Sequence, residues 1–413
     1  MTFSSETQSI FDANGFYLGK MLLQRLKPEA WPFALEDLPE GTVLVGGAVR
    51  DGLLNKQGIV PDLDFVLPSH AIETCKSLVK KYGGRAIELD SKRDIGRYVL
   101  KNWKIDLASQ IGQNLEEDLL RRDFSVNAIA LNLLPTPFLI DPSGGLKDLD
   151  EKKLVAIAEG NLIEDPLRIL RALRLMSELN FEVDSQTESL LGKHAELLET
   201  IASERIKMEI ERLINGYWAD DVIPLLIQLK LLEPWRDNSN SQETAPLSLK
   251  NVSSFTPNEL KLAFPLVRLT HLLSDRGLVN LGFSRKIIRS SNLLRIWQER
   301  NDGLAFVNLN ELDRLQLHLD LETFLPAIIL SIPNRDKKVW LNRWRDPLDP
   351  LFHPASPLDG NTLKETFQIA EGPWIGKLMF FLCKERAFGR LHNSYEAFEL
   401  ARYWLEHNQP FCD

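Results

Sequence analysis

The apolar residues of this sequence follow both strand-like and helical periods in its first part, and almost only a helical period afterwards. Up to about residue 150, short runs of aliphatic and β-branched residues alternate with helical segments, and glycines or prolines separate them. Residues 141–150 contain Pro142, Gly144 and Gly145 and are predicted to form turns. The other predicted elements are strands over 42–45, 63–67, 98–100 and 104–107, helices over 48–54 and 71–82, and a helix that runs into a strand over 115–133.

From about residue 161 the apolar residues recur at intervals of three and four, which is typical of amphipathic helices. Residues 237–257 interrupt this pattern with Ser, Asn, Thr and Pro and are predicted to be a linker or long loop. The expected fold class is an α/β N-terminal head followed by an all-α neck, body and tail. The expected boundaries are 1–150 for the head, with its core at about 30–150, then 151–236 for the neck, 237–257 for the linker and 258–413 for the body and tail.

Composition places the protein among soluble globular chains. Its 413 residues are 44% hydrophobic and 26% charged, and this length predicts about two to four domains. The cysteines Cys75, Cys383 and Cys412 are far apart and form neither a disulfide framework nor a CxxC metal motif. Residues 1–15 lack the apolar run of a secretory signal, and the longest apolar stretches, such as 324–332, are too short to span a bilayer. We therefore expect a cytoplasmic protein with no membrane partner.

The overall charge argues against a nucleic-acid partner. The sequence has 49 Lys+Arg against 58 Asp+Glu, which gives a formal net charge of -9. Proteins that bind nucleic acids usually present a positive surface. Binding of RNA would therefore depend on local clusters of basic residues.

Two aspartates, Asp62 and Asp64, lie at the entry of the predicted strand 63–67. Residues two apart on a strand point to the same face, so their carboxylates converge. A third acid, Asp106, interrupts the apolar strand 104–107. Converging carboxylates repel each other unless a cation neutralises them, and carboxylate oxygens suit Mg²⁺, so these acids are candidate catalytic residues. The alternative is a solvated strand edge, which is the commoner origin of so short a pattern.

Two glycines, Gly46 and Gly47, separate the strand 42–45 from the helix 48–54. Glycines let backbone N–H groups approach a phosphate closely, and the helix N-terminus that follows favours anions. Arg50 would reach the same phosphates. The alternative is a tight turn in which glycine supplies a positive φ and Asp51 forms a surface ion pair.

Six motifs, which occur in order over about residues 45–215, make the sequence similar to a known family. They are GGAVRD followed by DLD, RRDFSVNAIA, DPSGGLKDL, EDPLRILRALR and SERIKMEIERL. The sequence resembles the class II tRNA nucleotidyltransferases and bacterial poly(A) polymerases, the CCA-adding enzyme family. The resemblance implies a polymerase-β-like head and the addition of nucleotides to RNA 3′ ends without a nucleic-acid template. The implied partners are the tRNA 3′ end with CTP and ATP, and the implied cofactor is Mg²⁺.

The resemblance also assigns roles to residues of the head. It implies that Asp62 and Asp64 hold Mg²⁺ with Asp106 as a third acid, and that Gly47 and Arg50 contact the incoming nucleotide. The RRD motif is implied to recognise the ribose and phosphates, through the candidates Arg122, Asp123 and Asn127. For the two arginines of that motif, Arg121 and Arg122, an internal ion pair with Asp118 is the alternative, and both roles are compatible.

Asp165 and Arg168 lie at the start of a predicted neck helix. A carboxylate accepts hydrogen bonds and a guanidinium donates them. Cytosine and adenine each present an amino donor beside a ring-nitrogen acceptor, whereas uracil and guanine present the opposite order. A pair that reaches the base edge would therefore select C and A, and the resemblance implies the same role. The alternative is a well-formed helix start, with Asp165 as the N-cap and Pro166 as the first helical residue.

Local basic clusters are the candidates for contacts with phosphates. Arg168, Arg171 and Arg174 recur at three-residue intervals and could meet a triphosphate or an RNA backbone, with a solvated basic stripe as the alternative. In the C-terminal half, basic groups beside aromatic ones are able to bind RNA, although tryptophans at helical spacing more often belong to a core. The residues concerned are Lys337, Lys338, Arg343 and Arg345 with Trp340 and Trp344, and a separate cluster of Arg285, Lys286 and Arg289.

The segment between Asp106 and Arg121 is short, since only residues 107–120 separate them. Many members of the family have a longer flexible loop there, which helps to reshape the pocket for the final adenosine. The shortening resembles the CC-adding enzymes, so we expect addition of two cytidines, with addition of A as an open alternative. A poly(A) polymerase is the nearest other function, and a catalytically inactive RNA-binding module is a more distant one.

Overall fold

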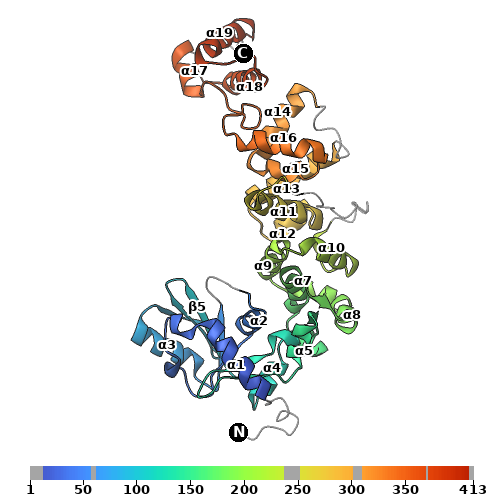
Figure 1. Cartoon of the computed structure of the whole chain (residues 1–413). Coiled ribbons are helices and arrows are strands. Elements are labelled where there is room, and N and C mark those ends of the chain that lie inside the picture. The colour runs from blue at the N-terminus through green and yellow to red at the C-terminus, as the bar shows by residue number, and fades with distance from the viewer. Residues whose placement is uncertain (1–12, 57–61, 237–251, 301–308, 369–370, 409–413) are drawn as a thin grey trace. The chain divides into compact units, whose positions relative to one another are not determined.

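The computed structural model describes residues 13–56, 62–236, 252–300, 309–368 and 371–408. The chain divides into two compact units, an N-terminal unit of Met1–Ala202 with Leu229–Leu231 and a C-terminal unit of Ser203–Gln228 with Leu232–Asp413. Figure 1 draws the strands and helices of both units. Most of the predicted linker, residues 237–251, lies outside the described residues. Within the described ranges, no helix is long and apolar enough to cross a membrane.

The N-terminal unit contains a mixed seven-stranded sheet within its described residues. The strand order is β3-β4-β5-β2-β1-β6-β7, and β2 and β5 are the parallel pair of this sheet. The strands are β1 Val43–Val45, β2 Leu63–Leu67, β3 Arg85–Asp90, β4 Ile95–Leu100, β5 Trp103–Ser109, β6 Ala130–Asn132 and β7 Phe138–Ile140. The four predicted strands are present, whereas β3 and β7 were not predicted, and β3 is exposed along most of its length at the sheet edge.

The N-terminal unit also contains helices and a 3₁₀ turn, and those at 47–53 and 71–82 confirm the predicted helices. The helices are α1 Ala13–Leu26, α2 Gly47–Leu53, α3 Ala71–Tyr82, α4 Leu115–Leu120, α5 Gly145–Asp150, α6 Glu159–Glu164, α7 Leu167–Leu179 and α8 Ser185–Lys193, and the 3₁₀ turn η4 covers Ser125–Asn127. One face of the sheet packs with α1 and α3 through a core that includes Leu44, Leu63, Phe65, Ile105 and Leu107. The opposite face packs with Leu119 of α4 through Val43, Val45 and Val66. Asp64 and Asp106 alternate with the first set and therefore lie on the second face.

Residues 141–150 differ from the prediction of turns alone, because Gly145–Asp150 form α5. The Asp141 carboxylate accepts hydrogen bonds from the backbone N–H groups of Gly145 (2.7 Å) and Leu146 (2.8 Å), which satisfies the start of this helix. A Cβ at position 145 would lie 2.2 Å from the carbonyl oxygen of Ser125, so only glycine fits there. The turn residues of this motif thus dock a short helix on η4.

The region after residue 150 also contains a two-stranded parallel sheet, β8 Lys153–Leu154 with β9 Glu182–Val183. The expectation of an almost purely helical pattern after residue 161 is therefore wrong at β9. A strand of two residues is too short to show a period of its own.

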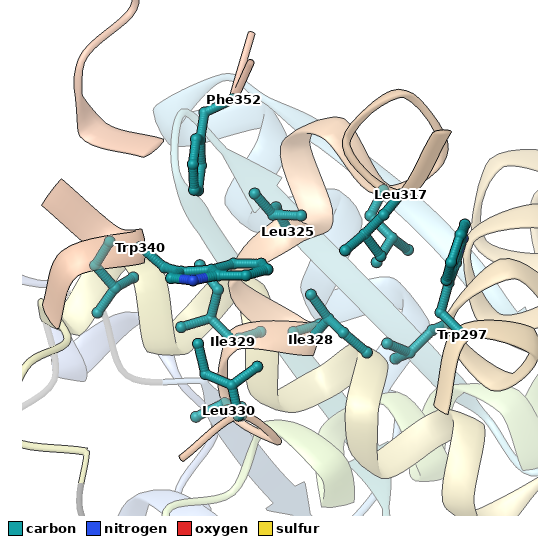
Figure 2. Packing of buried hydrophobic residues seen from close by; sticks show 14 of the residues in the cluster. Trp297, Leu317, Leu325, Ile328, Ile329, Leu330, Trp340 and Phe352 are labelled. Atoms are coloured by element: carbon teal, nitrogen blue, oxygen red, sulfur yellow. The ribbon is translucent and has the colours of Figure 1, made fainter. Parts of the chain in front are cut away.

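The C-terminal unit is helical throughout its described residues. Its main core surrounds α15 and α16, and Figure 2 shows the indole of Trp340 among Leu325, Ile329 and Phe352. A second core joins α17, α18 and α19. The helices are α9 Ser203–Asn215, α10 Ala219–Gln228, α11 Pro257–Leu272, α12 Asp275–Asn280, α13 Arg285–Glu299, α14 Glu311–Leu321, α15 Leu325–Ile329, α16 Asn334–Arg345, α17 Gly360–Phe367, α18 Trp374–Ala387 and α19 Ser394–Asn408.

Trp340, Arg343 and Arg345 of α16 contact residues of the C-terminal unit. Trp340 is only 4% exposed and meets Phe352 edge-on, with ring centroids 5.6 Å apart. Arg343 forms a two-point ion pair with Asp349, and Arg345 forms another with Glu259. The structure therefore favours the core over an RNA-stacking platform for Trp340.

Candidate active site

Three charged residues form a row across the second face of the sheet. Arg97 on β4 pairs directly with Asp106 on β5, which in turn pairs with Asp64 on β2. Residues paired across neighbouring strands point to the same face. Asp62 is exposed and precedes β2 by one residue. The structure thus brings together the acids that the sequence pointed to and adds Arg97, which the sequence analysis did not single out.

The acids influence one another's protonation. Burial raises the pKa of Asp64 to about 6, and the negative charges of Asp106 and Asp62 raise it too, while Arg122 and Arg97 act in the opposite direction. Neighbouring carboxylates repel each other when they ionise, and a bound cation relieves this repulsion. A raised carboxyl pKa beside other acids therefore indicates a place where a cation is stabilised. Within the described ranges, no group of three or more His, Cys, Asp or Glu side chains is already arranged to hold a metal.

The glycine turn lies beside these acids. Gly46 precedes α2 with φ 71° and ψ -136°, a conformation that glycine adopts without strain. A Cβ at this position would lie 3.4 Å from Oδ2 of Asp64 and 3.7 Å from Nη1 of Arg122. At Gly47 a Cβ would lie 3.7 Å from Nη2 of Arg50. Bare backbone therefore faces one acid and two arginines at this turn.

A chain of hydrogen bonds ties this turn to η4 and α7. Arg50 donates from Nη1 to Oδ1 of Asn127 (2.7 Å), and Asn127 donates from Nδ2 to Oδ1 of Asp123 (3.0 Å). Arg171 of α7 donates to the other oxygen of Asp123 (3.1 Å). Arg50 also pairs with Asp51 at 2.8 Å, so the ion pair expected as the alternative is present as well. Charge-assisted bonds of this kind hold the three elements in one arrangement.

Asp123 is the centre of that chain. Its side chain is buried, and burial raises its pKa, but the charge of Arg171 and hydrogen bonds from Asn127 and the Phe124 N–H lower the pKa further than burial raises it. Asp123 is therefore held as an anion inside the protein. Asn127, four residues after Asp123, makes this hydrogen bond across η4 rather than on one turn of an α-helix.

Arg122 and Arg121 point to different partners. Arg122 contacts Asp118 at 3.5 Å, and its buried Nε has no hydrogen-bond partner in the part of the chain that the structure describes. Arg121 pairs with Glu164 at 2.7 Å instead of Asp118. An arginine beside Gly46 and Asp64 that retains an unused donor is suited to bind an anion.

The neck helix α7 positions the pair proposed to read the base. Arg168 donates from Nη1 to the carbonyl oxygens of Arg121 (2.8 Å) and Asn161 (3.1 Å), and burial lowers its pKa. Asp165 ends α6 in an extended conformation. The prediction of Pro166 as the first helical residue is wrong by one position, because α7 begins at Leu167 after bonds of the tighter i to i+3 type.

The three arginines of α7 do not form a solvated stripe. Arg168 is half-buried, Arg171 pairs with Asp123, and Arg174 is only 7% exposed. The structure therefore contradicts the solvated alternative, and a role for Arg174 in binding phosphates stays a prediction.

Some residues that organise the site were not predicted. Asn161 donates to the carbonyl oxygens of Leu120 and Arg122, which fixes the RRD motif against α6. Arg97 forms a two-point ion pair with Asp106, with Nε to Oδ1 at 2.6 Å and Nη2 to Oδ2 at 2.8 Å. Strand parity in the segment 95–100 would have placed Arg97 on the face opposite Tyr98, but its partner depends on the strand register, which the sequence does not state.

Comparisons with known proteins show which family the chain is similar to. A family described as the poly A polymerase head domain matches residues 42–155, and one described as a probable RNA and SrmB-binding site of polymerase A matches residues 180–235. The CC-adding tRNA nucleotidyltransferase of Synechocystis sp. is 31% identical over 399 residues, which covers 90% of this chain and 95% of that relative. The CC-adding tRNA nucleotidyltransferase of Thermus thermophilus is 29% identical over 419 residues, covering 89% and 94%.

A solved structure shows the same fold. The crystal structure of the Bacillus stearothermophilus CCA-adding enzyme in complex with CTP superposes with a TM-score of 0.66 at 21% identity, over 96% of this chain and 99% of that one. The similarity along nearly the whole chain to named nucleotidyltransferases shows an enzyme of that class. The chain belongs to the CCA-adding enzyme family of nucleotidyltransferases.

Proposed function

We propose that this chain is a tRNA 3′-end nucleotidyltransferase that adds two cytidines from CTP and then stops. The observation that carries the proposal is the short connection between the third acid and the RRD motif. After Asp106, β5 ends at Ser109 and α4 begins at Leu115. The names of the relatives similar along nearly their whole length, from Synechocystis and Thermus, support the same activity.

The connection is held in place by its own hydrogen bonds. The N–H of Gln110 donates to the carbonyl oxygen of Leu67, and the N–H of Ile111 donates to the Asp118 carboxylate at 2.9 Å. Asn114 then caps α4 by accepting from the N–H of Glu117. A segment tied at these points has little freedom to reshape a pocket for a second kind of base, which supports arrest after cytidine.

We assign Mg²⁺ to Asp62 and Asp64. Their hard oxygen donors and the raised pKa of Asp64 fit a divalent cation at this place. When bound, the ion neutralises the triphosphate and stabilises the charge that develops during transfer. Arg122 and the bare backbone of Gly46 and Gly47, which lie beside Asp64, bind the phosphates. The RNA 3′-hydroxyl oxygen bonds to the α-phosphorus, the bond to pyrophosphate breaks, and the carboxylate cluster accepts the hydroxyl proton.

Asp165 and Arg168 select the base. The carbonyl oxygens of Arg121 and Asn161 hold Arg168, so its remaining N–H groups are directed without a loss of side-chain freedom on binding. A donor beside an acceptor suits cytosine, and it suits adenine equally well. This last property is the reason for keeping a second candidate, addition of the terminal A.

The test uses the full chain and tRNA that ends at the discriminator base, at C or at CC, each with CTP or ATP alone. With CTP, we expect two additions of C to tRNA that ends at the discriminator base, one addition to tRNA that ends at C, and no addition to tRNA that ends at CC. With ATP, we expect no addition to any of the three. Addition of A to tRNA ending in CC would instead establish the second candidate. Long A tracts on unrelated RNA would establish a poly(A) polymerase and contradict both.

A further inference from the structure

Arg97 occupies an unusual position for a cation. It stands on β4, directly across from Asp106 on β5, and it donates to both carboxylate oxygens at 2.6 and 2.8 Å. Within the described residues, it is the cation that contacts Asp106. Its side chain is 36% exposed and that of Asp106 is 30% exposed, so the pair lies at the open surface of the site and not in the core.

The pair involves the same carboxylate that the row of acids offers to a metal. Asp106 is the direct register partner of Asp64, and Arg97 lies one strand further along the same row. A guanidinium fork matches a carboxylate at two points and neutralises its charge. A divalent cation that recruits Asp106 therefore has to share its oxygens with a guanidinium that already neutralises their charge, and it binds them less tightly than it would bind a free carboxylate.

An ordinary cross-strand ion pair does not account for this placement. Cross-strand pairs stabilise a sheet wherever opposite charges face each other. Apart from Arg97–Asp106, five register pairs, from Ile95–Ala108 to Leu100–Trp103, and the buried Tyr98 already join the β4–β5 hairpin. What Arg97 adds is a positive charge beside Asp106, whose negative charge, like that of Asp62, raises the pKa of Asp64.

We propose that Arg97 is a built-in counter-cation that competes with the divalent metal for Asp106 and so sets the metal affinity of the site. The inference rests on the proposed function, because it assumes a metal at Asp62 and Asp64. Arg97 is in this sense a positioning residue. It holds the third carboxylate in register while no metal is bound and yields it when metal and nucleotide enter.

The test measures binding of Mn²⁺ to the full chain by the loss of the free-ion electron paramagnetic resonance signal, without nucleotide or RNA. Wild type is compared with Arg97→Gln, Asp106→Asn and the double variant. Arg97→Gln should bind Mn²⁺ about three- to tenfold more tightly, because it releases a carboxylate from a two-point pair. In the Asp106→Asn background the same substitution should have no effect. Arg93→Gln, which removes an exposed arginine paired with Asp90 at 3.8 Å, is the matched control and should change nothing.

The outcomes distinguish a failure of the competition at Asp106 from a failure of the metal assignment. Unchanged affinity in Arg97→Gln overturns the competition, and so does equal tightening with and without Asp106, since that would be a through-space effect of charge. If wild type shows no Mn²⁺ binding that depends on Asp62 and Asp64, the metal in the proposed function fails instead. Should Arg97→Gln not fold, Arg97→Lys decides the matter. It keeps the charge without the fork, so it should tighten binding by a smaller factor, and an unchanged affinity would again overturn the proposal.

Discussion

The candidate active site and the core of the C-terminal unit both bring charges into partly buried positions, but they balance them differently. In the C-terminal unit, Arg343 meets both oxygens of Asp349, and Arg345 meets both oxygens of Glu259. In the active site, acids gather on one face of a sheet, and the buried Nε of Arg122 has no partner among the described residues. Matched charges hold a fold together. Charges that lack a match within the chain indicate ligands that come from outside it.

The largest expected effect follows from removing the acids themselves. Asp62→Ala with Asp64→Ala should lower nucleotide incorporation by about a thousandfold or more, the scale on which groups that stabilise the transition state act. Thermal unfolding should be unchanged or shifted upward, because two carboxylates that repel others are removed. A primer-extension assay and a melting curve on the same preparation measure both. Incorporation that survives would contradict the assignment of the metal.

The second prediction concerns the core of the C-terminal unit, where the charges are paired within the chain. Trp340→Ala should destabilise the C-terminal unit by about 3–5 kcal/mol, because it leaves a cavity beside Leu325 and Phe352. Urea unfolding, followed by circular dichroism, measures the loss. Trp344→Ala is the control, since its half-buried side chain should cost less. If Trp340 were a stacking platform for RNA, its removal would weaken RNA binding and leave stability intact.

The sequence predicted some features of these regions and missed others, and the difference has a physical cause. Strand parity alone predicted that Asp62 and Asp64 share a face, because the side-chain period of a strand is fixed. The glycine turn was equally readable, since the backbone at Gly46 requires a positive φ. Both features are local. Their signal lies within a few residues of the chain.

What the sequence did not show depends on contacts between distant segments. Arg97 meets Asp106 only because β4 and β5 pair in one particular register. Arg174 looks like part of a basic surface stripe, and its burial follows from how α7 packs. Trp340 has the same spacing in a core as on a platform, so only its neighbours in space decide between the two.

A third prediction uses pH and is smaller. The pKa of Asp64 is raised to about 6 in the folded protein, so its stabilising contribution is complete below about pH 4 and is lost as the pH rises through 6. In metal-free buffer, Asp64→Asn should therefore match wild type near pH 4 and exceed its unfolding free energy by up to about 3 kcal/mol at pH 7. Urea titrations across this range measure the difference.

Asp123 supplies the control of opposite sign. Its pKa is lowered by Arg171 and by its hydrogen bonds, which outweigh burial, so its contribution is present at neutral pH and is lost as the pH falls through that lowered value. Asp123→Asn should therefore be less stable than wild type at pH 7, by a margin that narrows in acid. If the difference in unfolding free energy from wild type changed with pH in the same direction for Asp64→Asn and Asp123→Asn, the contrast between the two carboxylates would be wrong.

The smallest effect concerns exposed cations of the C-terminal unit, where paired and unpaired charges can be compared at the protein surface. Arg285, Lys286 and Arg289 are exposed at the start of α13 and have no carboxylate partner within the described residues, whereas Arg335 and Arg402 each pair with an acid. If unmatched charge again indicates an external ligand, changing the first three to Gln should reduce the salt dependence of tRNA binding by about 0.7–0.9 in the log–log slope for each phosphate that the protein no longer neutralises. Arg335→Gln with Arg402→Gln should leave the slope unchanged. Filter binding from low to moderate salt measures both slopes. If the two sets of variants give equal slopes, unpaired charge indicates an external ligand only in the active site. The physical reason would be that water solvates an exposed cation well but does not reach a buried carboxylate.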